Sequence, residues 1–487
     1  MKIKTAQDYM RSLRRLEHRV YYKGKRIKDV TRHPATAPHV RAAAVTYALA
    51  SDPEHRELAT AVSHLTGKTV SRFAHVHQNM EDLIKKVKLL RILGQKTGSC
   101  FQRCVGLDGI NAVYSVAYEI DKQCGTAYFE RFKKWLARIQ EENLMVVGAM
   151  TDPKGDRSRG PSEQADPDQY VRIVERRDDG LVIRGAKLHM TGGVNSHEIL
   201  VMPTTVMDEK SRDYAVVCAI PADAPGVTMV FGRQANDDRK DNRERIDSGN
   251  FLFGGVGGEA LIAFEDVFIP RERVFMDGET AFTNALVYRF AAHHRANYGG
   301  CKTGLIDVLT GAVTYLAQVQ GTAKAAHVRD KVTEMIHLGE TLYSSAIACA
   351  AEGWPTESGA YMVDTMLANV GKHNATRFHF EVARLAADLA GGFLATLPSE
   401  YDLESEQTGH LVKKYFSGVA GIPTEDRIKI GRLIESMTGG TALVESMHGA
   451  GSPQAQRVMI LREGNLDRKV KLAKALAGIT PDRERKG

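Results

Sequence analysis

Hydrophobic residues recur with two different periods along this chain, and the period changes twice. Up to about residue 142, apolar residues such as Leu83 and Val87 recur three or four positions apart, which is typical of helices. Helical spacing returns after about residue 280, for example over residues 428–437. We therefore expect one helical domain over residues 1–142 and another over residues 281–487.

Residues 143–280, between these regions, predict strands. Apolar runs flank the polar turn Asp178-Asp179-Gly180, so a β-hairpin is expected there. The runs that predict strands are residues 171–174, 181–183, 199–202, 214–220, 227–231 and 260–269. A strand-rich middle domain between two helical domains predicts an α+β fold.

The composition is that of an ordinary globular protein, and it limits the classes of function. Of the 487 residues, 43% are hydrophobic and 26% are charged, with a net charge of +7. The charge is spread along the chain, so nucleic acid is not an expected partner, whereas an anionic small substrate is compatible. The first residues form no apolar segment, and no apolar run approaches the ~20 residues of a membrane span, so no membrane partner is expected. Six cysteines without a secretion signal predict reduced thiols in the cytoplasm.

Two distant fragments carry the most informative chemistry. Cys100 and Cys104 are four positions apart, so on a helix both thiols lie on one face. His294 and Cys301 follow much later, and Gly299-Gly300 permits a close backbone approach before the last thiol. Three thiols and an imidazole suit an iron–sulfur cluster or a structural Cys3His zinc site, while a cysteine pair alone is more often two small buried apolar residues. The spacing indicates a metal site without selecting the metal. The other cysteines, expected to be packing residues, are Cys124, Cys218 and Cys349.

Longer segments around these residues resemble a known family. The matching segments are residues 94–104, 150–157, 184–187, 191–192, 257–261, 294–302, 390–392 and 445–454. With the order of the three domains and the segment 263–270, they resemble the acyl-CoA dehydrogenase fold. More closely, they resemble the 4-hydroxybutyryl-CoA dehydratases within the wider 4-hydroxyphenylacetate 3-hydroxylase family. The combination of Cys100, Cys104, His294 and Cys301 distinguishes these dehydratases from the monooxygenases of that family.

The resemblance implies a homotetrameric enzyme that binds FAD and a [4Fe-4S] cluster. Such an enzyme converts 4-hydroxybutyryl-CoA to crotonyl-CoA by a radical route and isomerises vinylacetyl-CoA as a side activity; its cofactors supply the difficult chemistry. The family pattern makes Cys100, Cys104 and Cys301 the thiolate ligands and His294 the unusual fourth ligand. The adjacent His293 is expected to be an ordinary core or surface histidine.

The same resemblance implies catalytic roles for four further residues. Glu259 and Glu445 are expected to move protons, and Glu259 is flanked by apolar residues, where burial raises the pKa of a carboxyl group into a useful range. Tyr298 and Lys302 flank the last cysteine ligand and are expected to orient the substrate. Gln102 is expected to form a hydrogen bond near the site.

The flavin contacts are also implied by the resemblance, because the chain has no G-x-G-x-x-G fingerprint for a dinucleotide. Thr191 is expected to donate a hydrogen bond to the flavin ring. The pair Gly391-Gly392 resembles the glycines that approach the FAD of another subunit. The remaining expected contacts, where the helical and strand-rich domains meet, are Met150, Thr151, Asp152 and Arg157.

Two alternative functions are compatible with parts of the pattern. One is a monooxygenase of the same family that uses reduced flavin and has no cluster. The other is a non-catalytic acyl-CoA-binding protein with a Cys3His zinc site. The segment from Glu400 to Lys413 is also shorter than the family pattern, so the substrate range is expected to differ if this segment lines the CoA entrance.

Overall fold

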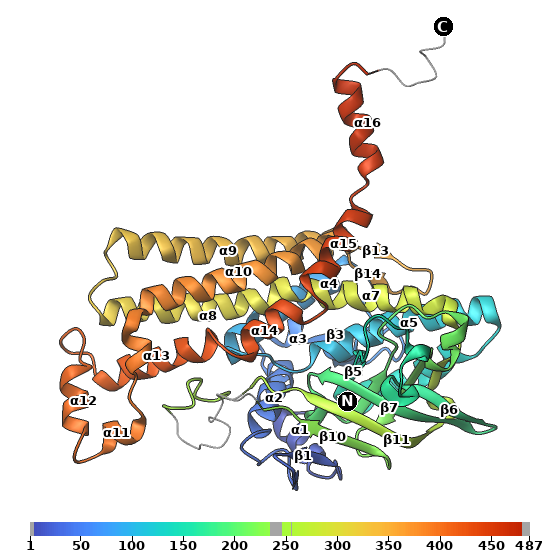
Figure 1. Ribbon diagram of the computed structural model, residues 1–487, viewed down its shortest axis with the longest axis horizontal. Coiled ribbons are helices and arrows are strands. Elements are labelled where there is room, and N and C mark those ends of the chain that lie inside the picture. Colours follow the sequence, from blue (N-terminus) through green and yellow to red (C-terminus); the bar gives the residue numbers. More distant parts are fainter. Residues whose placement is uncertain (1–3, 234–245, 255, 480–487) are drawn as a thin grey trace.

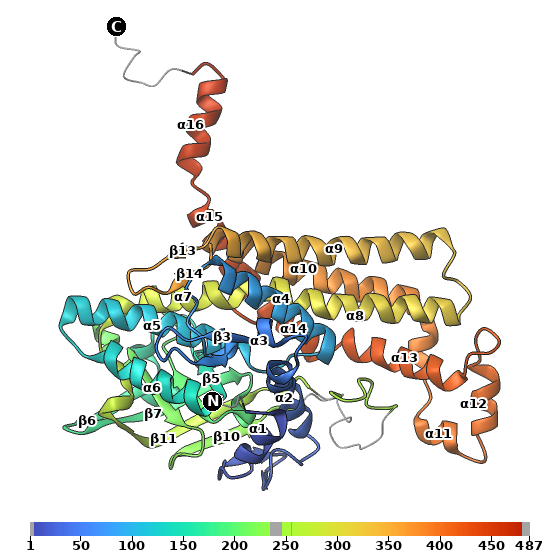
Figure 2. The ribbon, with the colours of Figure 1, turned by 180° about the vertical axis from the view of Figure 1, so that it is seen from behind.

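The computed structural model describes residues 4–233, 246–254 and 256–479. The long C-terminal helices form one layer, and the β-sheets lie on the opposite side of the molecule (Figure 1). Helix α5 packs against strand β5 and helix α7, while α4 packs on α8 and α9 (Figure 2). The helices of the first 142 residues are α1 (Ala6–Leu13), α2 (Ala37–Ser51), α3 (Arg56–Ala59), α4 (Met80–Thr97), α5 (Cys104–Cys124) and α6 (Tyr128–Glu142).

The strands form two main sheets, which confirms the strand-rich middle region. One sheet has the order β2 (Lys25–Ile27), β1 (Val20–Tyr22), β10 (Val227–Phe231), β11 (Ala260–Pro270), β7 (Gly180–Met190) and β6 (Arg172–Arg177). The other has the order β12 (Val274–Asp277), β9 (Val216–Pro221), β8 (Glu198–Val201) and β5 (Val146–Ala149). Two small hairpins are β3 (Thr60–Val62) with β4 (Thr69–Ser71), and β13 (Trp354–Pro355) with β14 (Tyr361–Met362).

The pairing of the strands agrees with the turn that the sequence predicts. Strands β6 and β7 pair antiparallel with Arg177 opposite Gly180, which confirms the predicted hairpin. Strand β1 pairs parallel with β10, so a segment near the N-terminus completes the larger sheet. The hydrophobic pattern did not predict β1 to β5, β12, β13 or β14, because strands of two to four residues are too short to show an alternating pattern.

The C-terminal region is helical, as predicted, so the α+β fold is confirmed. Its helices are α7 (Thr283–Ala296), α8 (Tyr298–Val319), α9 (Ala326–Ala351), α10 (Thr365–Ala390), α11 (Glu400–Glu404), α12 (Gly409–Tyr415), α13 (Thr424–Met437), α14 (Thr441–His448), α15 (Pro453–Glu463) and α16 (Leu466–Leu476). Ser452 caps α15 ahead of Pro453. The division into domains at residues 142 and 280 stays a prediction, although α6 ends at Glu142 and β5 begins at Val146.

Glycines allow α4 and α8 to cross with their backbones in contact. A Cβ atom on Gly300 of α8 would lie 2.7 Å from the carbonyl oxygen of Val87 on α4. A Cβ atom on Gly94 would lie 2.5 Å from the carbonyl oxygen of Cys301. Larger residues would force the helices apart, so these glycines hold the start of α8 against the last turns of α4. The crossing brings Cys301 close to the loop that carries Cys100.

The other three cysteines differ in their burial. Cys218 and Cys349 are buried in β9 and α9, which confirms that they are packing residues. Cys124 is exposed at the C-terminal end of α5, so its assignment to the core was wrong. Cys124 lies in the last turn of α5, beyond Ile120, which is the last buried residue of this helix. Within the described residues, no helix is long and apolar enough to cross a membrane.

Candidate active site

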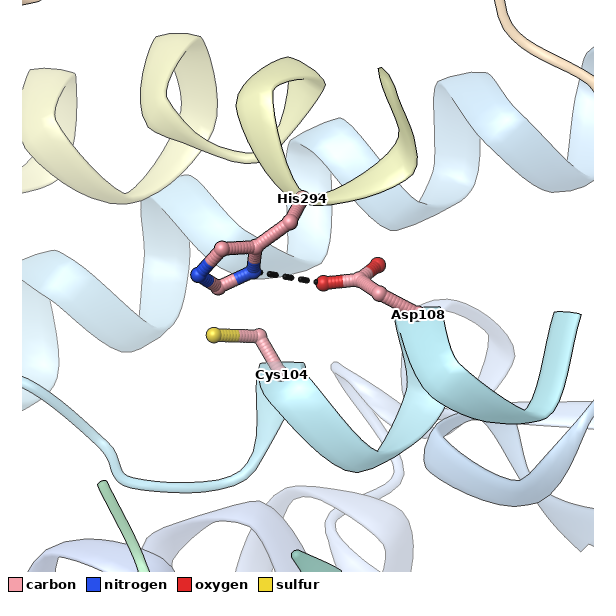
Figure 3. A group of neighbouring side chains, drawn as sticks. All are labelled: Cys104, Asp108 and His294. Carbon is pink, nitrogen blue, oxygen red and sulfur yellow. Dashed lines mark hydrogen bonds and ion pairs between the residues drawn. The ribbon is translucent and has the colours of Figure 1, made fainter. Parts of the chain in front are cut away.

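The four predicted metal ligands lie in one region, where α4, α5, α7 and α8 meet. The sulfur of Cys104 lies beside the imidazole of His294, and Asp108 lies on the other side of the ring (Figure 3). The ligand atoms of these three residues are within 4.8 Å of one another. Cys301 packs against the hydrophobic cluster that contains Cys104. The fold therefore assembles the thiols and imidazole from segments nearly 200 positions apart.

Cys100 and Cys104 do not share a helix face, so that expectation was wrong. Helix α4 ends at Thr97 because Gly98 adopts a left-handed φ of 56°, and Gln102 adopts a φ of 62° in the following loop. Helix α5 then begins at Cys104. The tight loop, rather than a helical turn, brings the two thiols together.

Burial and mutual proximity disfavour charge on all three thiols. Burial raises the pKa of Cys301 to about 12. Burial, followed by the neighbouring Cys100, Asp108 and Cys301, raises the pKa of Cys104 well above its ordinary value. Metal coordination requires thiolates, and a bound cationic metal supplies the charge that favours them. Three clustered thiols with an imidazole fit an iron–sulfur centre in donor chemistry.

Asp108 fixes the orientation of the His294 imidazole, and the sequence analysis missed it. The Nδ1–H of His294 donates to Asp108 Oδ2 at 2.8 Å, which leaves Nε2 as the nitrogen for a metal. Asn297 Nδ2 donates to the same oxygen at 2.6 Å, and the buried Lys86 ammonium lies 3.8 Å from Asp108 Oδ1. The available signal was the spacing of four positions from Cys104, which places both residues on one face of α5.

Replacing Asp108 by asparagine is expected to weaken metal binding without unfolding the chain. Loss of a carboxylate that orients a ligating histidine typically costs about 10- to 100-fold in metal affinity or activity. Iron content after dialysis against a chelator measures this loss. The matched control is Glu119→Gln, because Glu119 on the same helix pairs with Arg289 of α7 at 2.7 Å. Equal iron retention in both variants would contradict the role of Asp108.

His293 takes no part in this group, as expected. It is 1% exposed, and its ring lies 5.9 Å from that of His77. Burial lowers the pKa of His293 well below its ordinary value, so it is a neutral core histidine.

Lys302 and Tyr298 contact Glu445 beside the thiol group. The ammonium of Lys302, which is 2% exposed, lies 2.9 Å from Glu445 Oε2. Burial alone would lower the pKa of Lys302, but the attraction of Glu445 outweighs it and raises the pKa. The hydroxyl of Tyr298 is 3.4 Å from the Glu445 carbonyl oxygen. Glu445 is therefore held in place by two residues from the first turns of α8.

Lys372 is a second buried lysine at this site, and no sequence signal indicated it. Its ammonium donates to the carbonyl oxygen of Ser446 at 2.7 Å and lies 4.3 Å from the centre of the Tyr298 ring. Burial, then the nearby charge of Lys302, lowers the pKa of Lys372 to about 7. Lys372 thus fixes the last turn of α14, which carries Glu445, against Tyr298.

Glu259 faces the same region from the β-sheet side. It accepts a short hydrogen bond from the Thr191 hydroxyl, and its other carboxylate oxygen is 4.0 Å from His189 Nδ1. Its side chain is 27% exposed, and desolvation raises its pKa to about 7. Repulsion from Glu445 acts in the same direction on this pKa.

Gln102 connects the cysteine loop to the β-sheet. Its side-chain carbonyl accepts a hydrogen bond from the backbone N–H of Gly192 at 3.0 Å. Gly192 has a φ of 80°, and a Cβ atom there would lie 2.4 Å from the Gln102 carbonyl oxygen. The predicted hydrogen bond near the site is confirmed, and it holds the turn of Thr191 beside the thiols.

The residues predicted to contact the flavin differ in their burial and in their hydrogen bonds. Asp152 is buried and pairs with Lys187 at 2.7 Å, and Lys187 also donates to the Met150 carbonyl oxygen at 2.8 Å. The Thr151 carbonyl accepts from the backbone of strand β7, so residues 150–152 form a rigid edge. Arg157 is exposed. The predicted contacts with FAD stay predictions.

A small crevice of about 50 Å³ joins the two sides of this site. Its lining includes Cys100 from the cysteine loop, Gly257 ahead of β11, and Glu445 with Thr441 from α14. A cysteine thiol and a carboxylate thus open onto the same space.

These features define an enzyme of acyl-CoA dehydrogenase-like fold whose site combines carboxylates with thiols and an imidazole. The chain belongs to the 4-hydroxyphenylacetate 3-hydroxylase family, whose N-terminal model matches residues 5–276 and whose C-terminal model matches residues 283–478.

Relatives place the chain within that family. It is 51% identical, over 98% of its length and 99% of the relative, to the 4-hydroxybutyryl-CoA dehydratase/vinylacetyl-CoA-Δ-isomerase of Clostridium aminobutyricum. A solved structure of an oxygen-tolerant archaeal 4-hydroxybutyryl-CoA dehydratase from N. maritimus is 49% identical, with a TM-score of 0.96, covering 99% of this chain and 96% of that one. The oxygenase component of 4-hydroxyphenylacetate 3-monooxygenase in complex with FAD shares the fold at 22% identity, with a TM-score of 0.85 over 97% of this chain and 98% of that one. The expected resemblance to the dehydratases is confirmed.

Proposed function

We propose that this chain dehydrates 4-hydroxybutyryl-CoA to crotonyl-CoA and isomerises vinylacetyl-CoA. The observation that carries the proposal is the group of Cys104 and the Asp108-supported His294, together with a crevice onto which Cys100 and the carboxylate of Glu445 both open. A monooxygenase has no use for three thiols and an imidazole in one place. A structural zinc site does not require the carboxylates of Glu445 and Glu259, the latter with its pKa raised to about 7.

Two cofactors complete the proposed site. Cys100, Cys104, Cys301 and the Nε2 of His294 would hold a [4Fe-4S] cluster, and the β-sheet residues near Thr191 would contact FAD. When bound, FAD exchanges electrons with the acyl group and the cluster acts as a Lewis acid toward the departing hydroxyl. The related oxygenase structure with FAD supports the flavin part of this proposal.

The chain's own residues move and position protons. Glu259, with a pKa of about 7, both accepts and returns a proton at neutral pH, and we assign its carboxylate to the carbon next to the thioester. Lys302 and Lys372 fix Glu445 and its helix turn, so that its carboxylate stays directed into the crevice. The Thr191 hydroxyl orients Glu259 from the other side.

We also propose the homotetramer and the cytoplasmic location expected from the sequence. Nothing lies within 4 Å of a Cβ atom built on Gly391 or Gly392, so this surface at the far end of α10 is open to the FAD of another subunit. Helix α16 projects from the body of the molecule (Figure 1) and exposes Leu472 and Leu476, at 57% and 92%. An apolar arm of this kind is typical of a subunit contact.

Anaerobic purification followed by analysis of iron, sulfide and flavin tests the proposal. We expect about four irons and about one FAD per chain, as one cluster and one flavin require. The purified protein is expected to form crotonyl-CoA from 4-hydroxybutyryl-CoA without O2. Zinc without flavin would support the non-catalytic alternative. A requirement for O2 and reduced flavin would establish the monooxygenase instead.

A further inference from the structure

A fully buried lysine lies next to the carboxylate that supports His294. Lys86 of α4 is 1% exposed, and a buried ammonium is costly unless an opposite charge and hydrogen bonds compensate it. The acidic group that faces it is the buried Asp108 of α5, whose Oδ1 lies 3.8 Å from the ammonium. Burial lowers the pKa of Lys86, and the attraction of Asp108 is the largest effect that opposes this shift. The two residues therefore form a buried ion pair.

Asp108 connects this lysine to the imidazole through its two carboxylate oxygens. Figure 3 shows one oxygen directed at the ring of His294 and the other directed away from it. The first, Oδ2, accepts hydrogen bonds from His294 and Asn297 at 2.8 and 2.6 Å, and the second, Oδ1, faces Lys86. The charge of Lys86 thus acts on the group that orients His294.

The ion pair has a poor geometry for stabilising the fold. At 3.8 Å the two atoms are too far apart for a hydrogen bond, and neither has a hydrogen-bond partner in the part of the chain that the structure describes. A buried pair of this kind adds little to stability, because the loss of hydration offsets the attraction of the charges. The position of Lys86 beside the carboxylate that supports a proposed ligand indicates a role in the site instead.

Other neighbours of Lys86 are a thiol and two imidazoles, and these are neutral. Burial raises the pKa of Cys349, which the ammonium also affects, to about 12. Burial, followed by repulsion from Lys86, lowers the pKa of both His77 and His293 well below the ordinary value. The carboxylate of Asp108 is therefore the charge that the ammonium balances.

We propose that Lys86 is a positioning residue for the metal site: its ammonium balances the charge of Asp108, so that Asp108 holds the His294 ring with Nε2 toward the metal. The inference rests on the proposed function, because it requires His294 to ligate an iron of the cluster. Without the ammonium, the carboxylate is an uncompensated charge in the core. Such a charge favours any rearrangement that hydrates it, and the ring then loses its fixed orientation.

A comparison of single and double variants tests this role. Lys86→Met nearly preserves the length of the side chain and removes its charge. It is expected to lower the affinity for iron about 10- to 100-fold, the usual effect of losing a group that supports a ligating histidine. The double variant Lys86→Met/Asp108→Asn is expected to lose no more iron than Asp108→Asn alone, because it leaves no buried charge unbalanced.

Iron retained after anaerobic dialysis against increasing concentrations of a chelator measures each loss. The EPR spectrum of the retained, reduced cluster is a second readout, because it is expected to change in Lys86→Met but not if Lys86 only fills space. Lys85→Met is the matched control, since Lys85 is the adjacent residue of α4 and pairs with the exposed Glu57 and Glu81 at 2.9 and 2.8 Å. It is expected to keep the iron affinity and the spectrum of the wild type.

Two patterns of iron loss would overturn the role of Lys86. One is a double variant whose loss is the product of the two single losses, since the residues would then act independently. The other is equal retention of iron by Lys86→Met and the wild type. A wild-type protein that binds no iron would instead overturn the proposed function, and the role of Lys86 with it.

Thermal melting of the same variants decides the case in which Lys86→Met does not fold. Recovery of folding in the double variant would support the pairing, because a balance of charge, rather than the lysine itself, is then what the core requires. If both variants fail to fold, Lys86 is a structural residue and the proposed role is wrong.

Discussion

Replacing Cys100, Cys104 or Cys301 by alanine is expected to remove iron from the protein and to abolish dehydration. Each proposed thiolate would bond one iron directly. The buried Cys218 lies in β9 and the buried Cys349 lies toward the end of α9, outside the group formed by Cys104, Asp108 and His294. The three thiols also differ in setting, because Cys100 lies in a loop, Cys104 begins α5 and Cys301 lies in the first turn of α8. The measurement is iron and sulfide per chain in anaerobically purified protein, together with the rate of crotonyl-CoA formation.

Cys124→Ala provides the matched control for this prediction. Cys124 lies on the same helix as Cys104, at the opposite and exposed end. Its replacement removes a thiol from α5 without touching the site, so iron and activity are expected to stay at the wild-type level. Full iron and full activity in any variant of the first group would show that the ligand assignment is wrong.

The sequence predicted the parts of the fold whose signals are local. The hairpin around Gly180 was predicted because a turn and two apolar runs adjoin each other, and strand β10 occupies the predicted residues 227–231. Strand β1 was missed because its three residues become a strand by pairing with β10, about 200 positions later. Local patterns identify the side of a segment that is buried but do not identify its partner.

The same distinction applies to the site. The residues that match the family pattern, including Cys104 and His294, lie together in the folded chain. Asp108 and Lys372 act on residues contributed by other helices, through contacts that the fold alone creates. The helical spacing expected for Cys100 and Cys104 failed because Gly98 ends α4 before the first thiol. Gly98 thus replaces the expected helical turn between the two thiols with a loop. Both thiols still lie at the same site.

Replacing Glu259 by glutamine is expected to lower kcat by ~10²–10⁴-fold, the usual contribution of general acid–base catalysis. Glutamine preserves the volume and accepts the hydrogen bond from Thr191, so KM, iron and flavin are expected to change little. Glu265→Gln is the control, because Glu265 is exposed on the same strand, β11. A rise in KM with unchanged kcat would assign Glu259 to substrate binding.

The pH dependence provides an independent test of the same residue. A base must be deprotonated to act, and desolvation raises the pKa of Glu259 to about 7. In the wild type, kcat/KM is therefore expected to rise with pH up to about 7 and then level off. Thr191 and His189 lie next to this carboxylate, and the charges of Glu445 and Lys302 also act on its pKa. Glutamine does not titrate, so the rise near pH 7 is expected to vanish in Glu259→Gln; its persistence would assign the titration to another of these groups and remove Glu259 from the acid–base chemistry.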